Sequence, residues 1–180
     1  MPPPQGDLIV RAIRPDDNVK SLSIHNDYAP LRIFIRRRAC QYEACGVART
    51  HVVVAREHAE CAGRLWGYVT LSATEVITVD AYKPAAEWPE KWHIPAIKLA
   101  RMAVDEELQG QGVGSYLVDW AIALVNDHVA RHIGCRLIVV DAKKNAVGFY
   151  EKRGFTLLDT EANKARENPV MFLLLRNLAT

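Results

Sequence analysis

Hydrophobic and polar positions in the first part of the chain predict three strands. β-Branched residues at 8–14 end at Pro15, which cannot continue a central strand. Valine-rich residues at 50–55 and a long Val/Thr/Ile/Tyr stretch at 65–79, expected to bend at 72–74, predict the other two. Strands that follow one another in this way pair most simply as an antiparallel meander.

Two helices are predicted between the first and second of these strands. Asp16 and Asp17 offer N-cap chemistry to a short helix. A second helix is expected to begin at Pro30, a favoured first helical position, with Asp27 close by as a cap. Its apolar residues share one face and its arginines fall on others; these are Leu31, Phe34, Ile35 and Tyr42, and Arg32, Arg36 and Arg37.

The second part of the chain alternates strands and helices. Prolines and tryptophans at 82–95 predict a loop packed by its own aromatic side chains, of the kind that borders a site. A strand at 96–104 leads into a glycine cluster and then a helix with apolar residues at helical spacing, which are Val113, Leu117, Trp120, Ala121, Leu124 and Val125. Gly134 is expected as the C-cap of this helix.

The apolar run at 135–141 predicts a strand buried on both faces. We expect a short helix to follow it to about Arg153, where Gly154 stops it, and then strands at 155–158 and 171–175. Antiparallel strands first and a strand–helix–strand unit later predict an α/β protein with a mixed sheet and helices on its faces.

Composition adds limits to this picture. The chain has 180 residues, a net charge of +2 and 49% hydrophobic residues, which suits one globular domain over residues 1–180. No apolar run is long enough to cross a bilayer and the N-terminus lacks secretory features, so we expect a cytoplasmic protein. The cysteines, which are Cys40, Cys45, Cys61 and Cys135, form no CxxC pair and are interpreted as free thiols. The near-neutral charge does not by itself suggest nucleic acid.

The glycine cluster Gln109–Gly114 lies between a strand and an amphipathic helix. Glycines let the backbone approach a ligand closely, and unpaired N–H groups at a helix start attract anions, so we expect a phosphate site. No Gly-Lys-Ser/Thr follows, which excludes a P-loop. The dinucleotide fingerprint fails because its third glycine would fall on Ser115. A glycine turn that serves only geometry stays as the alternative.

Two motifs in this order resemble those of the GNAT superfamily of N-acetyltransferases. Gln109, Gly112 and Gly114 form Gln-x-x-Gly-x-Gly directly after the strand ending at Asp105, as in the acetyl-CoA signature. Phe149–Phe155 reads Phe-Tyr-x-x-x-Gly-Phe, as in the second motif. The resemblance covers most of the chain and implies the GNAT fold, with splayed central strands and acetyl-CoA as co-substrate.

A finer resemblance links the chain to the acetyltransferase toxins of bacterial type II toxin–antitoxin modules. It rests on residues 94–105, on Arg37-Arg38-Ala39 and on residues 46–50. Such toxins acetylate the amino group of charged tRNA, form homodimers and are neutralised by a ribbon-helix-helix antitoxin. Residues 24–28 replace the Phe-x-Cys-Gly turn of these toxins, and Lys143 stands where many GNAT proteins have asparagine.

The resemblance implies roles for particular residues. The N–H groups of Gln109, Gly110, Gln111, Gly112, Val113 and Gly114 would bind the CoA pyrophosphate. The strand edge at Met102, Ala103 and Val104 would hold the pantetheine arm, and an N–H there would polarise the thioester carbonyl. Asn145 is expected either to contact the cofactor or to cap a helix.

Tyr150 is our candidate general acid, because a phenol is protonated at neutral pH and can donate to the leaving thiolate. No general base is evident, and the acidic run at 105–107 is interpreted as a solvated face. An α-amine, with a pKa of about 7.7–8.0, needs a base less than lysine does.

Arginines form the densest positive cluster of the chain and suit contact with RNA phosphates; those assigned to the substrate are Arg36, Arg37, Arg38 and Arg49, with Arg32 beside them. The histidines lack metal-ligand spacing, and no metal is expected. Two alternatives stay open. One is an acetyltransferase of a small amine or a protein N-terminus, and the other is a module that binds CoA or RNA without turnover.

Overall fold

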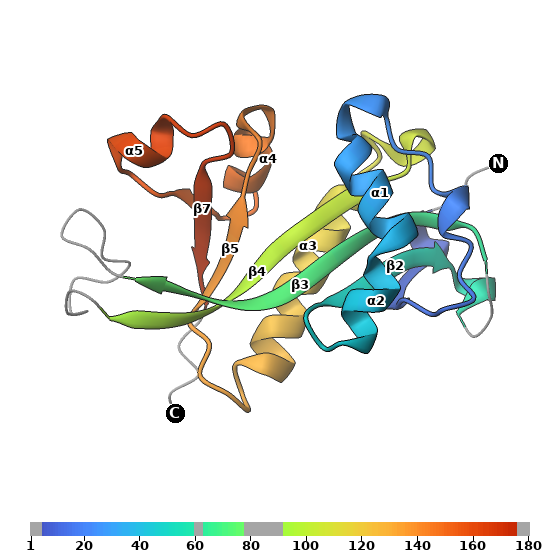
Figure 1. Ribbon diagram of the computed structural model, residues 1–180, viewed down its shortest axis with the longest axis horizontal. Helices are drawn as coiled ribbons and strands as arrows, with labels where there is room; N and C mark the ends of the chain where they lie inside the picture. Colours follow the sequence, from blue (N-terminus) through green and yellow to red (C-terminus); the bar gives the residue numbers. More distant parts are fainter. Residues whose placement is uncertain (1–4, 60–62, 78–91, 176–180) are drawn as a thin grey trace. The chain divides into compact units, whose positions relative to one another are not determined.

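The computed structural model describes residues 5–59, 63–77 and 92–175 (Figure 1). Its strands form a sheet in the order β1-β2-β3-β4-β5-β7-β6. Their bounds are β1 Leu8–Ala12, β2 Arg49–Ala55, β3 Leu65–Ile77, β4 His93–Val104, β5 Leu137–Asp141, β6 Thr156–Leu157 and β7 Val170–Leu174. The α-helices are α1 Ala29–Arg37, α2 Ala39–Ala44, α3 Val113–Leu124, α4 Val147–Glu151 and α5 Glu161–Lys164.

The chain divides into two compact units. Residues 1–72 and 100–120 make up the first, and residues 73–99 and 121–180 make up the second. The elements β3, β4 and α3 contribute residues to both. Within the part of the chain that the structure describes, no helix is long and apolar enough to cross a membrane.

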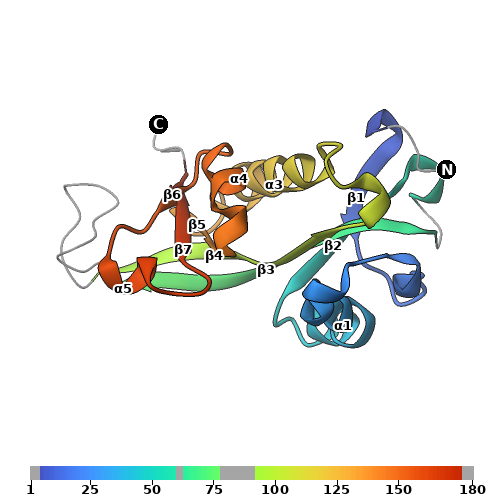
Figure 2. The same cartoon turned by 90° about the horizontal axis from the view of Figure 1, so that it is seen from above.

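The first unit is built on the predicted meander, in which β2 pairs antiparallel with both β1 and β3. The helices α1 and α2 cover one face of these strands, and α3 begins on the other (Figure 2). Because strand side chains alternate, Val52 and Val54 join the cluster under α1, whereas Val53 faces the side of Leu117 on α3.

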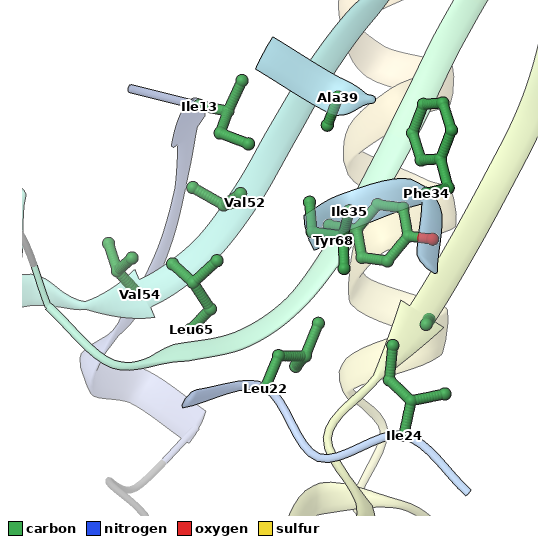
Figure 3. Packing of buried hydrophobic residues seen from close by; sticks show 11 residues of the cluster. Ile13, Leu22, Ile24, Phe34, Ile35, Ala39, Val52, Val54, Leu65 and Tyr68 are labelled. Atoms are coloured by element: carbon green, nitrogen blue, oxygen red, sulfur yellow. The ribbon is translucent and has the colours of Figure 1, made fainter. Parts of the chain in front are cut away.

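Tyr68 lies at the centre of the cluster under α1. Its side chain is fully buried, and its ring stacks 6.3 Å from the Phe34 ring. Figure 3 shows Phe34 and Ile35 of α1 beside it. Its hydroxyl donates to the Leu31 carbonyl (2.9 Å), so the one polar atom of the ring is satisfied against the helix backbone.

The second unit holds the parallel part of the sheet. β5 pairs parallel with β4 and antiparallel with β7, which confirms the predicted mixed sheet. The β4–β5 ladder covers only the pairs from Ala96↔Leu137 to Lys98↔Val139, although β4 continues to Val104. An ion pair between Lys98 Nζ and Asp141 Oδ2 (2.5 Å) lies where this ladder ends. Such an early end matches the splayed central strands that were expected.

Most predicted strands are confirmed, with shifted ends. β4 begins at His93, earlier than expected, because Pro95 still accepts the Arg136 N–H through its carbonyl (2.9 Å). The Gly154 stop is confirmed: this residue has φ +84°, and the next N–H, of Phe155, turns back to the Tyr150 carbonyl (3.1 Å). The loop predicted at 82–95 lies almost wholly outside the described residues, as does Cys61.

Three local predictions are wrong. Asp17 caps no helix; its carboxylate instead pairs with Arg11 (2.6 Å) and accepts the Arg14 N–H (2.8 Å). Asp27 does not cap α1, whose N-cap position is Tyr28. Gly134 is not a C-cap, because α3 passes into a π-turn at Val125–Val129 that ends the helix first.

Two further differences concern helices. The predicted second helix is broken at Arg38, so Tyr42 lies on α2 rather than on α1. Sequence patterning missed α5, a short helix whose N-cap is Thr160, with the Thr160 side chain accepting the Asn163 N–H (3.1 Å). Its length of 4 residues is too short for an apolar period to appear.

Candidate active site

The glycine loop ahead of α3 offers backbone N–H groups to a ligand. Gly110 and Gly112 have φ values of +75° and +86°, which L side chains rarely adopt, and Gln109–Gly112 are exposed. The first bond into the helix runs from the Tyr116 N–H to the Gly112 carbonyl (2.9 Å). The N–H groups of the preceding first turn therefore have no acceptor within the helix, as an anion site requires.

The two glutamines of the loop turn back onto its own backbone. Gln109 Nε2 donates to the Val104 carbonyl (3.5 Å), and Gln111 Nε2 donates to the Glu107 carbonyl (2.7 Å). Both side chains thus satisfy carbonyls and none of the N–H groups. The backbone N–H groups of Gln109 and Gln111 also donate within the chain, to the carbonyls of Glu106 (3.4 Å) and Leu108 (3.3 Å). The donors that the loop leaves to a ligand are therefore those of its glycines and of the first turn of α3, so the prediction that every N–H from Gln109 to Gly114 is available is wrong for the two glutamines.

Asp105 is the buried anchor of this loop, although sequence analysis placed the whole acidic run on a solvated face. That prediction is wrong for Asp105, which is 0% exposed, whereas Glu106 and Glu107 are exposed. Its carboxylate accepts the N–H groups of Ser23 (2.9 Å) and Glu107 (3.1 Å). Arg64 lies 3.4 Å from it and supplies the countercharge that a buried carboxylate needs.

The neighbouring carboxylates are also engaged. Glu106 accepts the Ser23 hydroxyl (2.8 Å), and its N–H donates to the Ser23 carbonyl (3.1 Å). Glu107 pairs with Arg64 at 2.6 Å. Asp105 and Glu106 therefore tie the glycine loop to Ser23 in the segment before α1, and Glu107 ties it to Arg64 before β3. All three carboxylates are engaged, and none is a free base.

Residues 102–104 form the end of β4, as predicted, and lie directly before Asp105. Ala103 is buried, and Met102 and Val104 are half-buried. β3 approaches this strand closely at Gly67, where an added Cβ would lie 3.0 Å from the Ala103 carbonyl. The absence of a side chain at Gly67 therefore sets the position of the backbone at Ala103.

Tyr150 of α4 is 7% exposed and sits between two aromatic rings, 5.0 Å from Phe149 and 5.5 Å from Phe155. Burial raises the pKa of its phenol to about 12. Among the described residues, no hydrogen bond partner of its hydroxyl is found. The side chain is thus held by its ring, stays protonated at neutral pH and keeps its donor for a ligand.

Asn145 is exposed and lies in a 3₁₀ turn, Lys144–Ala146, between β5 and α4. The N-cap position of α4 is Ala146, so the alternative that Asn145 caps this helix is wrong. Contact with the cofactor remains a prediction.

The predicted RNA-binding arginines fall into two groups. Arg36 Nη2 donates to the Lys20 carbonyl (3.2 Å), and Arg49 pairs with Glu43 (2.8 Å). Arg37 and Arg38 are exposed, and no ion pair of theirs is found within 5–59, 63–77 and 92–175. Two of the four are therefore engaged within the protein, and two present free cations.

Comparison with known proteins defines the class to which this fold and loop belong. The family model described as Acetyltransferase (GNAT) domain matches residues 48–157. The chain belongs to the GNAT acetyltransferase family, and it is an N-acetyltransferase that uses acetyl-CoA.

Particular relatives narrow this class. The chain is 32% identical over 153 residues to a tRNA-acetylating toxin of Mycobacterium tuberculosis (strain ATCC 25618 / H37Rv), a match that covers 84% of this chain and 86% of the relative. The structure of AtaT complexed with acetyl-methionyl-tRNAfMet is similar with a TM-score of 0.77 and 24% identity, over 93% of this chain and 95% of AtaT. A tyrosine-to-phenylalanine mutant of KacT has a TM-score of 0.78 and 22% identity, over 94% and 95% of the two chains.

The residues present fit acetyl-CoA. Positive-φ glycines and the free N–H groups of a 12-residue helix suit a pyrophosphate, which is a doubly charged anion. Among the described residues, no group of three or more His, Cys, Asp or Glu side chains could hold a metal ion.

Proposed function

We propose that this acetyltransferase modifies the α-amino group of an aminoacyl-tRNA, as a toxin of a toxin–antitoxin module. The observation that carries the proposal is the similarity to a tRNA-acetylating toxin across 84% of this chain. The likeness to AtaT with its tRNA product supports it. Location in the cytoplasm belongs to the same proposal, because charged tRNA is found there.

The engaged carboxylates support an α-amine as the acceptor. Asp105, Glu106 and Glu107 are all bound to other groups of the chain, so the acidic run offers no free general base. An α-amino group titrates near 7.7–8.0, against about 10.4 for lysine, and is in good part neutral at physiological pH. Such an amine is nucleophilic without prior deprotonation by the enzyme.

Each part of the candidate site has a role in this proposal. Acetyl-CoA supplies an acetyl thioester. The N–H groups within Gln109–Gly114 that are not used by the chain bind its pyrophosphate, since those of Gln109 and Gln111 already donate to the Glu106 and Leu108 carbonyls. Residues 102–104 and Asn145 bind the remainder of the cofactor, and an N–H of 102–104 polarises the acetyl carbonyl. Tyr150 donates a hydrogen bond to the leaving sulfur. With its pKa near 12, against about 8.5 for a thiol, Tyr150 stabilises the thiolate better by hydrogen bonding than by full proton transfer.

Arg37 and Arg38 are the arginines assigned to RNA phosphates, since their cations are unpaired within the described residues. Arg36 and Arg49 contribute to the positive potential from engaged positions. A homodimer and a small ribbon-helix-helix antitoxin complete the proposal. A structure of a mutant AtaT toxin bound to the C-terminus of the antitoxin AtaR supports an antitoxin as partner; the homodimer and the ribbon-helix-helix type rest on the family resemblance alone.

The test is thiol release from acetyl-CoA with four acceptors: charged tRNA, the same tRNA deacylated, the methyl ester of the same amino acid, and a peptide with a free N-terminus. We expect kcat/KM for charged tRNA to exceed that for the ester and the peptide by at least about 100-fold, and no release with deacylated tRNA. Preference for the ester or peptide would overturn the aminoacyl-tRNA proposal. Binding of CoA or RNA with no release from any acceptor would indicate a non-catalytic module.

A further inference from the structure

The side chain of Arg101 lies on the face of β4 that faces α1. The Phe34 ring orients its guanidinium, which has no ion pair among the described residues. Strand alternation puts Arg101 on the same face as Ala103, which belongs to the buried cluster under α1 and α2. Its guanidinium carbon lies 4.9 Å from the centroid of the Phe34 ring, and the ring itself is only 4% exposed. A cation at this distance from an aromatic face is attracted to it, so the side chain is oriented.

The hydrogen-bonding capacity of Arg101 is largely unused. Its Nη1 donates to the adjacent Ala100 carbonyl (2.9 Å), and the residue is exposed. Over the described ranges, no carboxylate lies within 4.0 Å of its guanidinium, whereas Arg11, Arg49 and Arg64 each have one. An oriented arginine with free donors is suited to an external anion, and above all to phosphate.

The charge of Arg101 also acts on the protein around it. Burial raises the pKa of the Tyr68 phenol, and the nearby Arg101 cation opposes that shift.

The place of Arg101 in the strand relates this cation to acetyl transfer. It directly precedes residues 102–104, which are assigned to the thioester in the proposed function. α3, which is assigned to the pyrophosphate, packs on the opposite face of the meander, where Leu117 meets Gly67. With the cofactor assigned to the α3 face, the exposed Arg101 lies on the opposite face, which the proposal below assigns to the acceptor.

We propose that Arg101 binds a backbone phosphate at the 3′ end of the aminoacyl-tRNA acceptor and so selects RNA-borne α-amines over free ones. This rests on the proposed function. In a charged tRNA the amino acid is esterified to the terminal ribose, and the phosphate of that nucleotide is the first anion beyond the amine. Arg101 directly precedes the backbone assigned to the thioester, so among the described arginines of β4 its guanidinium is the one placed to bind this phosphate.

The test compares two acceptors in the same protein preparation: charged tRNA, and the methyl ester of the same amino acid, which has no phosphate. Arg101→Gln is expected to lower the ratio of kcat/KM for tRNA to kcat/KM for the ester by about tenfold or more, through KM for tRNA. The salt dependence of tRNA use should lose about one unit of slope. Because both acceptors see the same enzyme, the ratio does not depend on the folded fraction.

Two further variants sharpen the result. Arg101→Lys keeps the charge and should retain the salt slope while losing part of the preference. Arg166→Gln removes an exposed cation between α5 and β7 and should leave the ratio within twofold. An unchanged ratio in Arg101→Gln, with wild type still preferring charged tRNA, would overturn the role of Arg101 alone. A wild type that does not prefer charged tRNA overturns the proposed function, and this inference falls with it.

Discussion

The glycine loop ahead of α3 and the short helix α4 are built for binding in opposite ways. In the loop, Gln109–Gly112 are exposed, both glutamines donate to carbonyls of the chain, and the N–H groups of the glycines remain for a ligand. In α4, the backbone is used within the turn, and a single side chain, Tyr150, is held between aromatic rings. Ligand binding by the loop depends on its backbone φ angles, whereas the contribution of α4 depends on the Tyr150 hydroxyl.

This difference determines which substitutions matter in each region. A change at the loop acts through backbone conformation and should alter how tightly acetyl-CoA binds. A change at Tyr150 that keeps the ring leaves conformation intact and should alter only the chemical step. Substitutions in the loop should therefore change KM for acetyl-CoA, whereas substitutions of Tyr150 should change kcat.

Removing the Tyr150 hydroxyl is expected to have the largest effect. Tyr150→Phe keeps the ring contacts with Phe149 and Phe155, and no hydroxyl bond within the described residues is lost. We expect kcat to fall by about 100-fold or more, as for the loss of one hydrogen-bond donor to charge that develops in the transition state, with KM for acetyl-CoA within twofold. Steady-state kinetics and a thermal unfolding curve check both points. Unchanged turnover would contradict the role of Tyr150.

Strain at the loop should have an intermediate effect. Gly110 has φ +75° with nothing within 4 Å of an added Cβ, so Gly110→Ala changes backbone preference and introduces no clash. Left-handed backbone costs an L-residue about 1–2 kcal/mol, which predicts a rise in KM for acetyl-CoA of about tenfold with kcat little changed.

Gly46 provides the matched control for this strain. It has φ +67° and equally open surroundings, but it lies between α2 and β2. Gly46→Ala should lose similar stability and leave KM for acetyl-CoA unchanged. Gly134→Ala, which is open and has no positive φ, should change neither. Equal rises in KM for Gly110→Ala and Gly46→Ala would show that the loop conformation has no special part in binding.

The same contrast explains how much of the site the sequence predicts. A glycine at a loop position indicates that the backbone there needs a positive φ, and Tyr150 stands in a recognisable motif. Both features can therefore be found from the sequence alone. The burial of Asp105 cannot, because its partner Ser23 is 82 positions away and only the fold brings the two together. Arg36 and Arg49 also look like free cations in the sequence, because residue type does not show that the Lys20 carbonyl and Glu43 engage them once the chain has folded.

The fold follows a similar division. Long apolar stretches predict β2, β3 and β5 well because they are buried along most of their length. Helix ends are predicted poorly, because Asp17 and Gly134 have the right chemistry for caps, but Asp17 bonds the nearby Arg11 and Arg14 and the π-turn at Val125–Val129 ends α3 before Gly134. Apolar patterning thus identifies the elements, whereas the hydrogen bonds that end them depend on geometry that residue type alone does not give.

The smallest expected effect is that of high pH. Tyr150 must be protonated to donate, and burial raises its pKa to about 12, so its protonated form is fully present through pH 10 and is lost only as pH rises toward 12. The acceptor α-amine must be neutral, and it becomes so above about pH 7.7–8.0. We therefore expect kcat/KM for charged tRNA to rise with unit slope below that range and to stay level to pH 10. Initial rates in constant-ionic-strength buffers from pH 6 to 10 test this. A fall beginning near pH 9 would contradict the burial-raised pKa of Tyr150, and a rise that continues to pH 10 would contradict the α-amine as the nucleophile.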